Sequence, residues 1–424
     1  MSNAATLQGN ARFAARLKQR YRAERMFRAL GLFAVAFSVL VLGFLLFTMT
    51  ANGIAGFKRA ELRFEMDLTR GGLTIDPAQL IGPGAVPALE AAGLPGAVTA
   101  AATKAVTAAS NAQAAQLLES ELADDAWREV AARLIADPAL TTGKFTVSVP
   151  VSKDLASAMR DEATGDLATA AHQLKDRGLL VRAFDPGFLT RSDATDPQSV
   201  GIWGALKGSI LTMFVTLILA FPVGVFAAVY LEEYAPKNRW TDVIEVSINN
   251  LAAVPSIIFG LLGLAVFLAI FPYYRSAPLI GGMTLALMTM PVIVISGRNA
   301  IKAVPPSIRD GALAIGASKV QTVFQHVVPL ALPGILTGTI IGMARALGET
   351  APLLMVGMRA FVATPPDSFT APSSVLPVQI FLWSDEIDRG FVERTSAAII
   401  VLLLFLLAMN SLAIYLRNRF ERRW

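Results

Sequence analysis

Six apolar runs, each long enough to cross a bilayer, constrain the fold of this chain more than any other feature. They lie at residues 29–49, 210–231, 246–271, 279–297, 331–357 and 397–416. In lipid, a run of about 20 apolar residues satisfies its backbone hydrogen bonds as a helix. With 54% hydrophobic and 16% charged residues, the composition also lies outside the range that is usual for soluble globular proteins. We therefore predict an all-α polytopic membrane protein with six transmembrane helices.

Residues 50–207, between the first two runs, contain no segment apolar enough to span a membrane. Helical periodicity at residues 116–136 and 156–176 predicts helices, and Phe145, Val147 and Val149 alternate with polar residues in a predicted strand at 144–151. We predict a soluble α+β insert here. The full division is a basic arm at 1–28, the first span at 29–49, the insert at 50–207 and a five-helix core at 208–424.

The basic residues at both ends of the chain predict its topology. The arm at 1–28 carries seven Lys or Arg against Glu24, and the tail carries Arg417, Arg419, Arg422 and Arg423 against Glu421. Because basic segments stay in the cytoplasm and six spans return the chain to its starting side, we expect both termini to be cytoplasmic and residues 50–207 periplasmic. The arm is expected to contact anionic membrane lipid. A cleaved signal peptide is the alternative for the first run, but its length favours a retained span.

A polar hairpin at residues 302–330, called the docking loop below, separates the fourth and fifth runs. Ser307 with Asp310, and Ser318 with Gln321, predict two short capped helices. The loop is interpreted as a docking element for a cytoplasmic partner or as a plain structural connection. A DNA-reading unit is disfavoured because the loop's only phosphate-contacting cations are Lys302, Arg309 and Lys319, so no nucleic-acid partner is expected.

Arg345 and Glu349 are the only charged residues between positions 331 and 358. A charge at the centre of a span costs about 3 kcal/mol to insert, so the pair needs a reason. One interpretation is an intrahelical ion pair that only lowers this cost. The other is a binding site for a tetrahedral oxyanion, with Arg345 as its ligand, Glu349 orienting it and Thr350 adding a hydroxyl donor. Arg298, at the inner end of the fourth run, is expected to snorkel to the interface.

Helix breakers occur in four of the runs. They are Pro222 and Gly224 in the second, Asn249, Asn250, Pro255 and Ser256 in the third, Pro291 in the fourth, and Gly348 and Pro352 in the fifth. We expect these residues to interrupt their spans. Broken helices are tolerated in a membrane where protein buries them or where they line an aqueous path, and packing kinks are the simpler interpretation of each one.

The residue inventory excludes several kinds of chemistry. The chain has no cysteine and two histidines, His172 and His326, so no metal or cofactor is expected. No nucleotide-binding loop of the GxxxxGK[ST] type and no nucleophile-base set occurs, so no catalytic residue is expected either. Any ATP must be used by a partner.

Three segments together resemble one family. Residues 251–264 read LAAVPSIIFGLLGL and residues 345–354 read RALGETAPLL, and the docking loop spaces Asp310, Gly311 and Ala312 before Gly316 and Pro329. From about residue 202 onward, the chain resembles the PstA-type permease subunits of bacterial phosphate-specific ABC importers. The loop has Asp-Gly where that family has Glu-Ala in its EAA loop, and His326 stands where an aliphatic residue is usual.

The resemblance implies a multi-pass subunit of the bacterial inner membrane that imports inorganic phosphate, with Arg345 in contact with phosphate. It implies that the docking loop, with Ser307, Asp310, Gly311, Ala312, Gly316 and Pro329, fits a cleft on the ATPase. The implied partners are a second permease subunit (PstC-like), ATPase subunits (PstB-like) and a periplasmic phosphate-binding protein (PstS-like). A permease for phosphonate or sulfate, and a membrane-anchored periplasmic sensor or scaffold, remain alternatives. The insert is interpreted as a contact for the binding protein or as a passive spacer.

Overall fold

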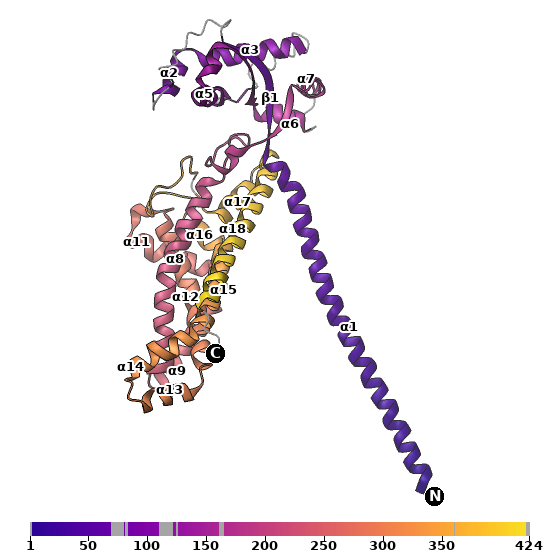
Figure 1. Cartoon of the computed structure of the whole chain (residues 1–424), viewed down its shortest axis with the longest axis vertical. Helices are drawn as coiled ribbons and strands as arrows, with labels where there is room; N and C mark the ends of the chain where they lie inside the picture. Colours follow the sequence, from indigo (N-terminus) through magenta and orange to yellow (C-terminus); the bar gives the residue numbers. More distant parts are fainter. Residues whose placement is uncertain are drawn as a thin grey trace. The chain divides into compact units, whose positions relative to one another are not determined.

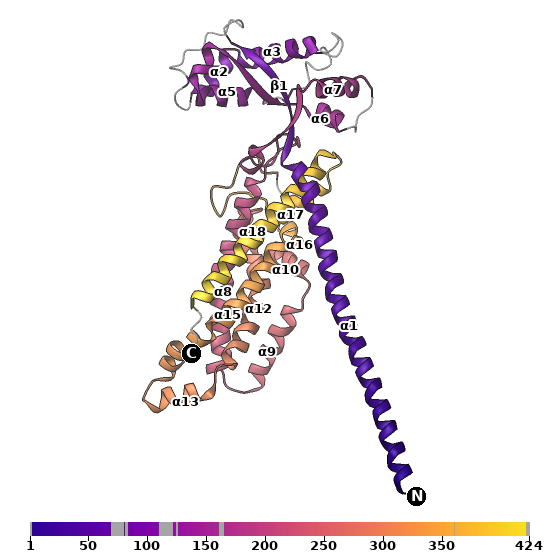
Figure 2. The ribbon, with the colours of Figure 1, turned by 45° about the vertical axis from the view of Figure 1, so that its right-hand side comes forward.

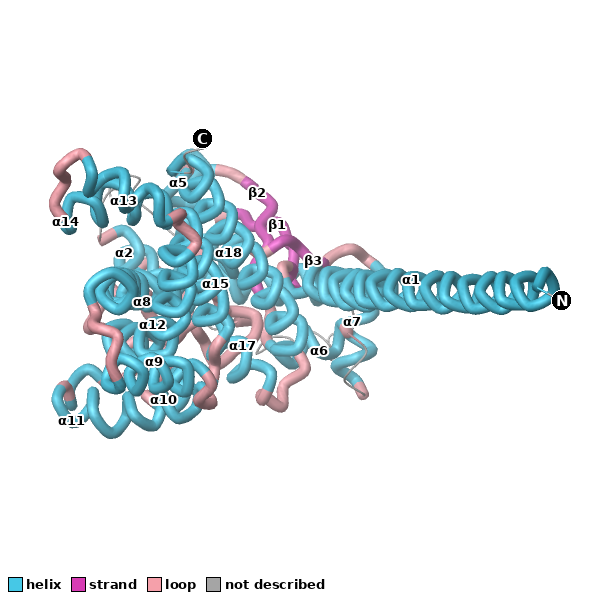
Figure 3. Tube along the Cα trace, turned by 90° about the horizontal axis from the view of Figure 1, so that it is seen from below, coloured by secondary structure: helices cyan, strands magenta, loops and turns pink. Residues whose placement is uncertain are grey.

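The computed structural model describes residues 2–68, 80, 84–109, 122–123, 126–160, 165–359 and 361–420. The chain forms two compact units, Met1–Asn52 and Gly53–Trp424. Helices dominate the described residues, and their strands are confined to the insert (Figures 1 and 3). This arrangement confirms the prediction of a helical membrane protein with a small α+β insert.

The first unit lies within α1 (Ser2–Gly56), whose last four residues belong to the second unit, and this helix contains the predicted first span. Its apolar residues occur around the whole circumference rather than on one stripe, which is typical of a helix surrounded by lipid. The helix runs seven residues beyond the predicted end of the span, up to the start of the insert.

The insert is built on a three-stranded antiparallel sheet in the order β2–β1–β3. The strands are β1 (Lys58–Asp67), β2 (Lys144–Pro150) and β3 (Leu180–Phe184). Leu62, Phe64 and Met66 of β1 lie opposite the three predicted core residues of β2, Val149, Val147 and Phe145. All six side chains are buried, which confirms the predicted strand and its core face.

The described part of the insert also contains the α-helices α2 (Ala85–Ala91), α3 (Leu94–Ala109), α5 (Ala126–Ala136), α6 (Lys153–Met159) and α7 (Asp166–Asp176). In the insert, α3 packs on β1 and α5 on β2 (Figure 2). The predicted helix at 116–136 is too long, because Leu122 forms a β-bridge with Val151 and α5 begins only at Ala126. The rest of that prediction, residues 116–121 and 124–125, lies outside the described residues. The predicted helix at 156–176 is two helices, with Gly165 at φ +99° before the second.

The transmembrane core contains four long helices. They are α8 (Trp203–Val229), α12 (Pro278–Lys302), α15 (Val328–Gly348) and α18 (Gly390–Phe420). Both α8 and α15 pack on α12 through glycines. A Cβ atom on Gly224 would lie 2.8 Å from Ile293 Cγ2, and one on Gly338 would lie 2.1 Å from Ser296 Cβ. Small residues therefore let these backbones approach closely, as in other membrane bundles.

The expectation that prolines break the second and fourth spans is wrong. Pro222 lies inside α8 and Pro291 inside α12, and both helices continue through them. A proline removes one backbone hydrogen bond, and close packing on the neighbouring helix holds the remaining turns in place.

The third and fifth runs are broken, as predicted. In the third, α9 (Arg239–Ala252) is followed at Pro255 by α10 (Ser256–Leu262), a π-helical turn (Gly263–Phe267) and α11 (Leu268–Ile270), and the two halves meet at 103°. In the fifth, α15 ends at Gly348 and α16 (Ala351–Met355) follows, because Pro352 cannot bond to the Gly348 carbonyl.

By length and composition, five helices among the described residues can cross a membrane, and they correspond to five of the six predicted spans. The bent pair of α9 with α10 and α11 corresponds to the remaining one, the third run. A second bent pair, α2 with α3, also passes this test, but its residues Leu89, Leu94 and Val98 are buried in the core of the insert.

A buried charge cluster joins the insert to the core. The carboxylate of Asp185, just after β3, accepts from Arg191 Nη2 at 2.7 Å and from Arg394 Nη2 of α18 at 3.1 Å. Arg59 of β1 lies 3.8 Å from the same carboxylate and also pairs with Glu129 of α5. The insert is therefore attached to the last span by ion pairs as well as by the chain itself.

Candidate functional site

The break between α15 and α16 holds the three residues predicted to bind an oxyanion. Arg345 lies in the last turn of α15, and its Nε is 3.3 Å from Glu349 Oε1. Glu349 is the C-cap of α15, and its backbone is extended (φ −80°, ψ 115°). The ion pair therefore joins the last helical turn to the first residue beyond the helix, and the two residues do not lie on one continuous helix. Thr350 follows at the start of α16, without a side-chain cap bond.

The exposure of this pair distinguishes it from its neighbours on α15. Ala346 and Leu347 are buried in the transmembrane core, whereas the side chain of Arg345 is 49% exposed and that of Glu349 is 20% exposed. A charged side chain within a membrane-spanning helix is costly without a partner, and Glu349 is the partner that the structure shows for Arg345. The geometry accommodates both earlier interpretations, a bare ion pair and an anion ligand oriented by a carboxylate.

The docking loop begins with α13 (Pro306–Ala314). Ser307 was expected to cap this helix, and that expectation is wrong: Pro305 holds the capping position and the helix starts at Pro306. Proline suits the first helical position because its φ is already helical and its missing N–H has no partner to lose. Asp310 and Gly311 lie on the exposed side of α13, and Ala312 is buried.

The second half of the loop begins at α14 (Lys319–Gln321), with the predicted capping box. Ser318 Oγ accepts from Gln321 N at 3.3 Å, and Gln321 Oε1 accepts from Ser318 N at 2.9 Å. The helix was expected to be short and separate, but it continues through a π-helical turn (Thr322–Val327) into α15. The docking loop is therefore one end of the same helix that carries Arg345.

Four exposed apolar residues of the loop form what we call the docking face: Leu313, Ile315, Val320 and Phe324. Ile315 is 84% exposed and stands next to Gly316, which turns the chain with φ +92°. On α13, Ala312 is buried and Ile308 partly buried, whereas Ile315 is exposed. On the second half of the loop, Val323 and Val327 are buried while Val320 and Phe324 are exposed, because the π-helical turn adds a residue and changes which side faces the core.

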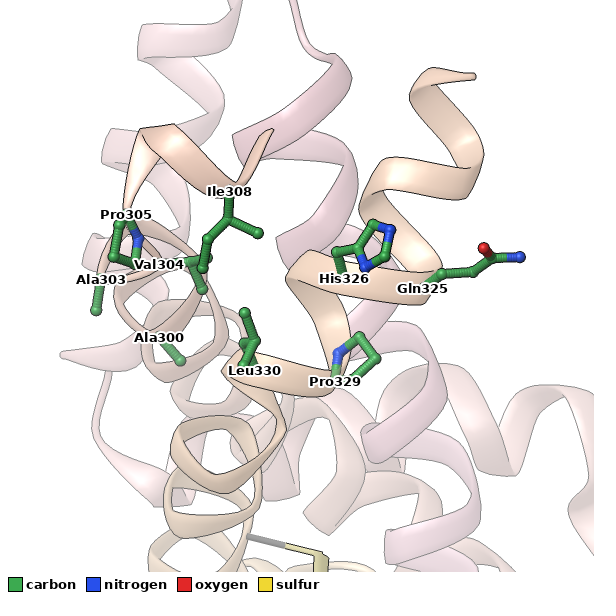
Figure 4. A pocket seen from close by; sticks show the side chains of 9 residues that line it. All are labelled: Ala300, Ala303, Val304, Pro305, Ile308, Gln325, His326, Pro329 and Leu330. Carbon is green, nitrogen blue, oxygen red and sulfur yellow. The ribbon is translucent and has the colours of Figure 1, made fainter. Parts of the chain in front are cut away.

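A pocket of about 620 Å³ opens between the two halves of the loop (Figure 4). Val304 and Ile308 line it from the α12–α13 side, and His326 of the π-helical turn and Pro329 at the start of α15 line the other side. Its lining is mostly apolar. His326 is exposed at this pocket.

Several charged contacts at the end of the core next to the docking loop were not predicted. Arg298 is paired with two glutamates: its Nη2 is 2.8 Å from Glu245 Oε2 and its Nε is 3.5 Å from Glu232 Oε2. Arg309 pairs with Glu233 at 2.7 Å. Glu232 and Glu233, directly after the second apolar run, are the sequence feature that could have indicated these contacts. Their partners lie more than 50 residues further along the chain.

Among the described residues, no group of three or more histidine or carboxylate side chains is placed to hold a metal ion. Comparison with known families gives a more specific result. Residues 205–424, more than half of the chain, match the family model of the binding-protein-dependent transport system inner membrane component. The chain belongs to this family. Residues 14–169 match a second model, described as a domain of unknown function (DUF3333), which covers α1 and most of the insert.

Individual relatives agree with this assignment. The chain is 31% identical over 224 residues to phosphate transport system permease protein PstA 1 of Mycobacterium tuberculosis, covering 53% of this chain and 72% of that protein. It is 30% identical over 214 residues to PstA of Yersinia pestis (50% and 71%). It is 35% identical over 198 residues to the probable ABC transporter permease protein YqgI of Bacillus subtilis (46% and 66%). The predicted resemblance to PstA-type permeases is confirmed.

Among solved structures, the inward-facing MetNI methionine ABC transporter resembles this chain with a TM-score of 0.42 and 18% identity, covering 52% of this chain and 95% of that one. The family and the apolar helices together make this chain a multi-pass inner-membrane permease component.

Proposed function

We propose that this chain is the permease subunit of an ABC importer that moves inorganic phosphate across the bacterial inner membrane. The observation that carries the proposal is the Arg345–Glu349 pair, half-exposed at a break in a transmembrane helix. Relatives named as phosphate transport permeases in Mycobacterium tuberculosis, Yersinia pestis and Haemophilus influenzae support phosphate as the cargo.

The chemistry of the break suits an oxyanion. A guanidinium presents several N–H donors in one plane, which matches two oxygens of a phosphate group. Glu349 orients the guanidinium and offsets the cost of keeping a cation in the membrane when no anion is bound. Thr350, the next residue, supplies a hydroxyl donor close to the same point.

The docking loop supplies the connection to an energy source. Its docking face offers apolar area to an ATPase subunit, and burying such area is the main source of affinity in protein contacts. Because α14 continues into α15, a displacement of the loop by the ATPase moves the helix that ends at Arg345. ATP is hydrolysed by that partner, and this chain contributes no catalytic residue.

The remaining partners follow from the same scheme. A second permease subunit covers the exposed side of α15, and a periplasmic phosphate-binding protein delivers the anion. Both termini lie in the cytoplasm, residues 50–207 lie in the periplasm, and the basic arm contacts anionic lipid.

Uptake of labelled phosphate by cells that carry Arg345→Gln tests the proposal. We expect a fall of about tenfold or more, because the charged donor is lost. Arg345→Lys keeps the charge without the planar fork and should recover only part of the uptake. Arg419→Gln, at an exposed arginine near the end of α18, is the matched control. Copurification with the ATPase verifies assembly of each variant.

Excess unlabelled sulfate or phosphonate identifies the cargo in the same experiment. Competition by either one as strong as that by phosphate would favour the other-oxyanion alternative. Wild-type uptake by an assembled Arg345→Gln complex would reduce the pair to a structural role. A chain without any uptake that still assembles and signals would favour a sensor.

A further inference from the structure

The π-helical turn at Tyr230–Tyr234, which ends α8 and is called the acidic turn below, contacts every cation of the docking loop. Lys302 Nζ lies 3.6 Å from Glu232 Oε2, and Arg309 Nη2 lies 2.7 Å from Glu233 Oε1. Lys319 Nζ lies 5.0 Å from the centroid of the Tyr234 ring. These are the three cations first considered as nucleic-acid contacts.

Consecutive residues of the acidic turn reach different elements. Glu232 faces α12, where Arg298 also approaches it, and Glu233 faces α13. Neighbouring side chains on a helix point in different directions, so two adjacent carboxylates can hold two elements at once. The turn therefore connects the inner end of α8 to both sides of the docking loop.

The contact of Arg309 is the most enclosed of these. Glu233 is only 10% exposed, and Arg309 donates to it from both Nε (3.0 Å) and Nη2 (2.7 Å). The same guanidinium donates to the carbonyls of Ile301 and Val304 at the end of α12, at 2.9 and 2.7 Å. Charge-assisted bonds with several donors fix orientation as well as distance. Arg309 thus holds α13, the end of α12 and the end of α8 in one arrangement.

We propose that Arg309 and Glu233 are positioning residues for energy coupling. They transmit a displacement of the docking loop to α8, in addition to the covalent route through α12 and α15. This inference rests on the proposed function, because it assumes an ATPase that moves the loop. Without the pair, α13 follows the ATPase while α8 stays in place, so ATP is hydrolysed without a matching movement of the transmembrane core.

The test uses the complete transporter, with both permease subunits, the ATPase and the binding protein, in proteoliposomes. Phosphate uptake and ATP hydrolysis are measured in the same sample. We expect Arg309→Gln and Glu233→Gln to lower the phosphate moved per ATP by about fivefold or more, with ATP hydrolysis retained. Arg309→Lys keeps the positive charge and donors for Glu233, and should recover part of the ratio. Lys237→Gln, an exposed cation just beyond the turn, should leave it unchanged.

A wild-type ratio in assembled Arg309→Gln would overturn the inference, as would an assembled Arg309→Lys variant as uncoupled as Arg309→Gln. If the single variants do not assemble, the test uses the double variant Glu233→Cys with Arg309→Cys, whose two thiols are joined by a bifunctional thiol reagent. The reagent reacts only at these positions of this chain, because the natural chain has no cysteine. Joining should restore the ratio, and an assembled, joined pair that stays uncoupled contradicts the inference. A wild-type complex without phosphate uptake would instead reject the proposed function.

Discussion

Arg394, near the start of α18, donates to the fully buried carboxylate of Asp185 at 3.1 Å, and to the carbonyls of Pro197 and Gly56 at 2.8 Å each. One guanidinium therefore joins the last span to the segment that leaves β3 and to the end of α1. Several hydrogen bonds to one buried guanidinium fix the orientation of the insert on the last span as well as strengthening the attachment.

Removing the carboxylate from this cluster should destabilise the protein strongly. Asp185→Ala leaves Arg191 and Arg394 without their shared partner, and we expect a loss of about 3 to 5 kcal/mol in the free energy of unfolding. Denaturant unfolding in detergent measures it. Glu65→Ala, which removes an exposed pair with Lys144, is the control and should cost no more than about 1 kcal/mol. Equal stability of the two variants would contradict this account of the joint.

Close packing of α15 on α12 should make Gly338 intolerant of a side chain. In Gly338→Ala the new methyl group would overlap Ser296, and we expect a loss of about 1 to 3 kcal/mol in stability. Ser296→Gly in the same chain removes the overlapping atoms and should restore most of that loss. Thermal unfolding of the single and double variants measures both effects. A double variant no more stable than Gly338→Ala would show that another contact is responsible.

Loss of apolar area from the docking face should weaken the hold on the ATPase. Ile315→Ser removes an exposed side chain that gains about 1.5 to 3 kcal/mol when fully buried, so binding should weaken about tenfold or more. Titration of detergent-purified permease with the ATPase measures this. Ile387→Ser makes the same change at an exposed residue between α17 (Leu376–Ser384) and α18, and should leave binding unchanged. Equal affinity of both variants would exclude Ile315 from the contact.

The two glycines of the docking loop should respond to alanine in opposite directions. Gly316 has φ +92°, where a Cβ atom is strained, so Gly316→Ala should cost about 1 to 2 kcal/mol. Gly311 is exposed inside α13, and a Cβ atom added there would have no neighbour within 4 Å. Gly311→Ala should therefore strengthen the helix by up to about 1 kcal/mol. Hydrogen exchange of the α13 amides reports both. Slower exchange in Gly316→Ala would be inconsistent with the strain.

Asp193 should give the protein a pH dependence in the acid range. Burial raises the pKa of this carboxyl above 3.8, against a hydrogen bond that Trp383 Nε1 donates to it at 3.1 Å. Because the folded state binds the proton more tightly than the unfolded state, the contribution to stability is greatest below 3.8 and falls as pH rises through the raised pKa. Asp193→Asn should remove this decline. Unfolding of both proteins across the acid range measures the difference, and parallel pH profiles would contradict it.

Local patterns predicted the features that depend on neighbours in the chain. The six apolar runs marked the spans, because a bilayer demands about 20 apolar residues whatever else surrounds them. Alternation at Phe145, Val147 and Val149 predicted a strand and its buried face, and Ser318 with Gln321 predicted a helix start. The residues proposed for the anion site were found in the same way, since two charges in an apolar run are unusual by themselves.

The tertiary structure decided whatever depends on partners far along the chain. Pro222 leaves its helix continuous while Pro255 and Pro352 stand at breaks, although all three remove the same hydrogen bond. Arg298 and Arg309 pair with carboxylates that lie 53 to 76 residues away in the sequence, which no spacing rule predicts. Bilayer thickness and backbone hydrogen bonding act over a few residues and are legible in the sequence. The choice among possible packing and ion-pair partners depends on which surfaces meet, and only the folded chain contains that information.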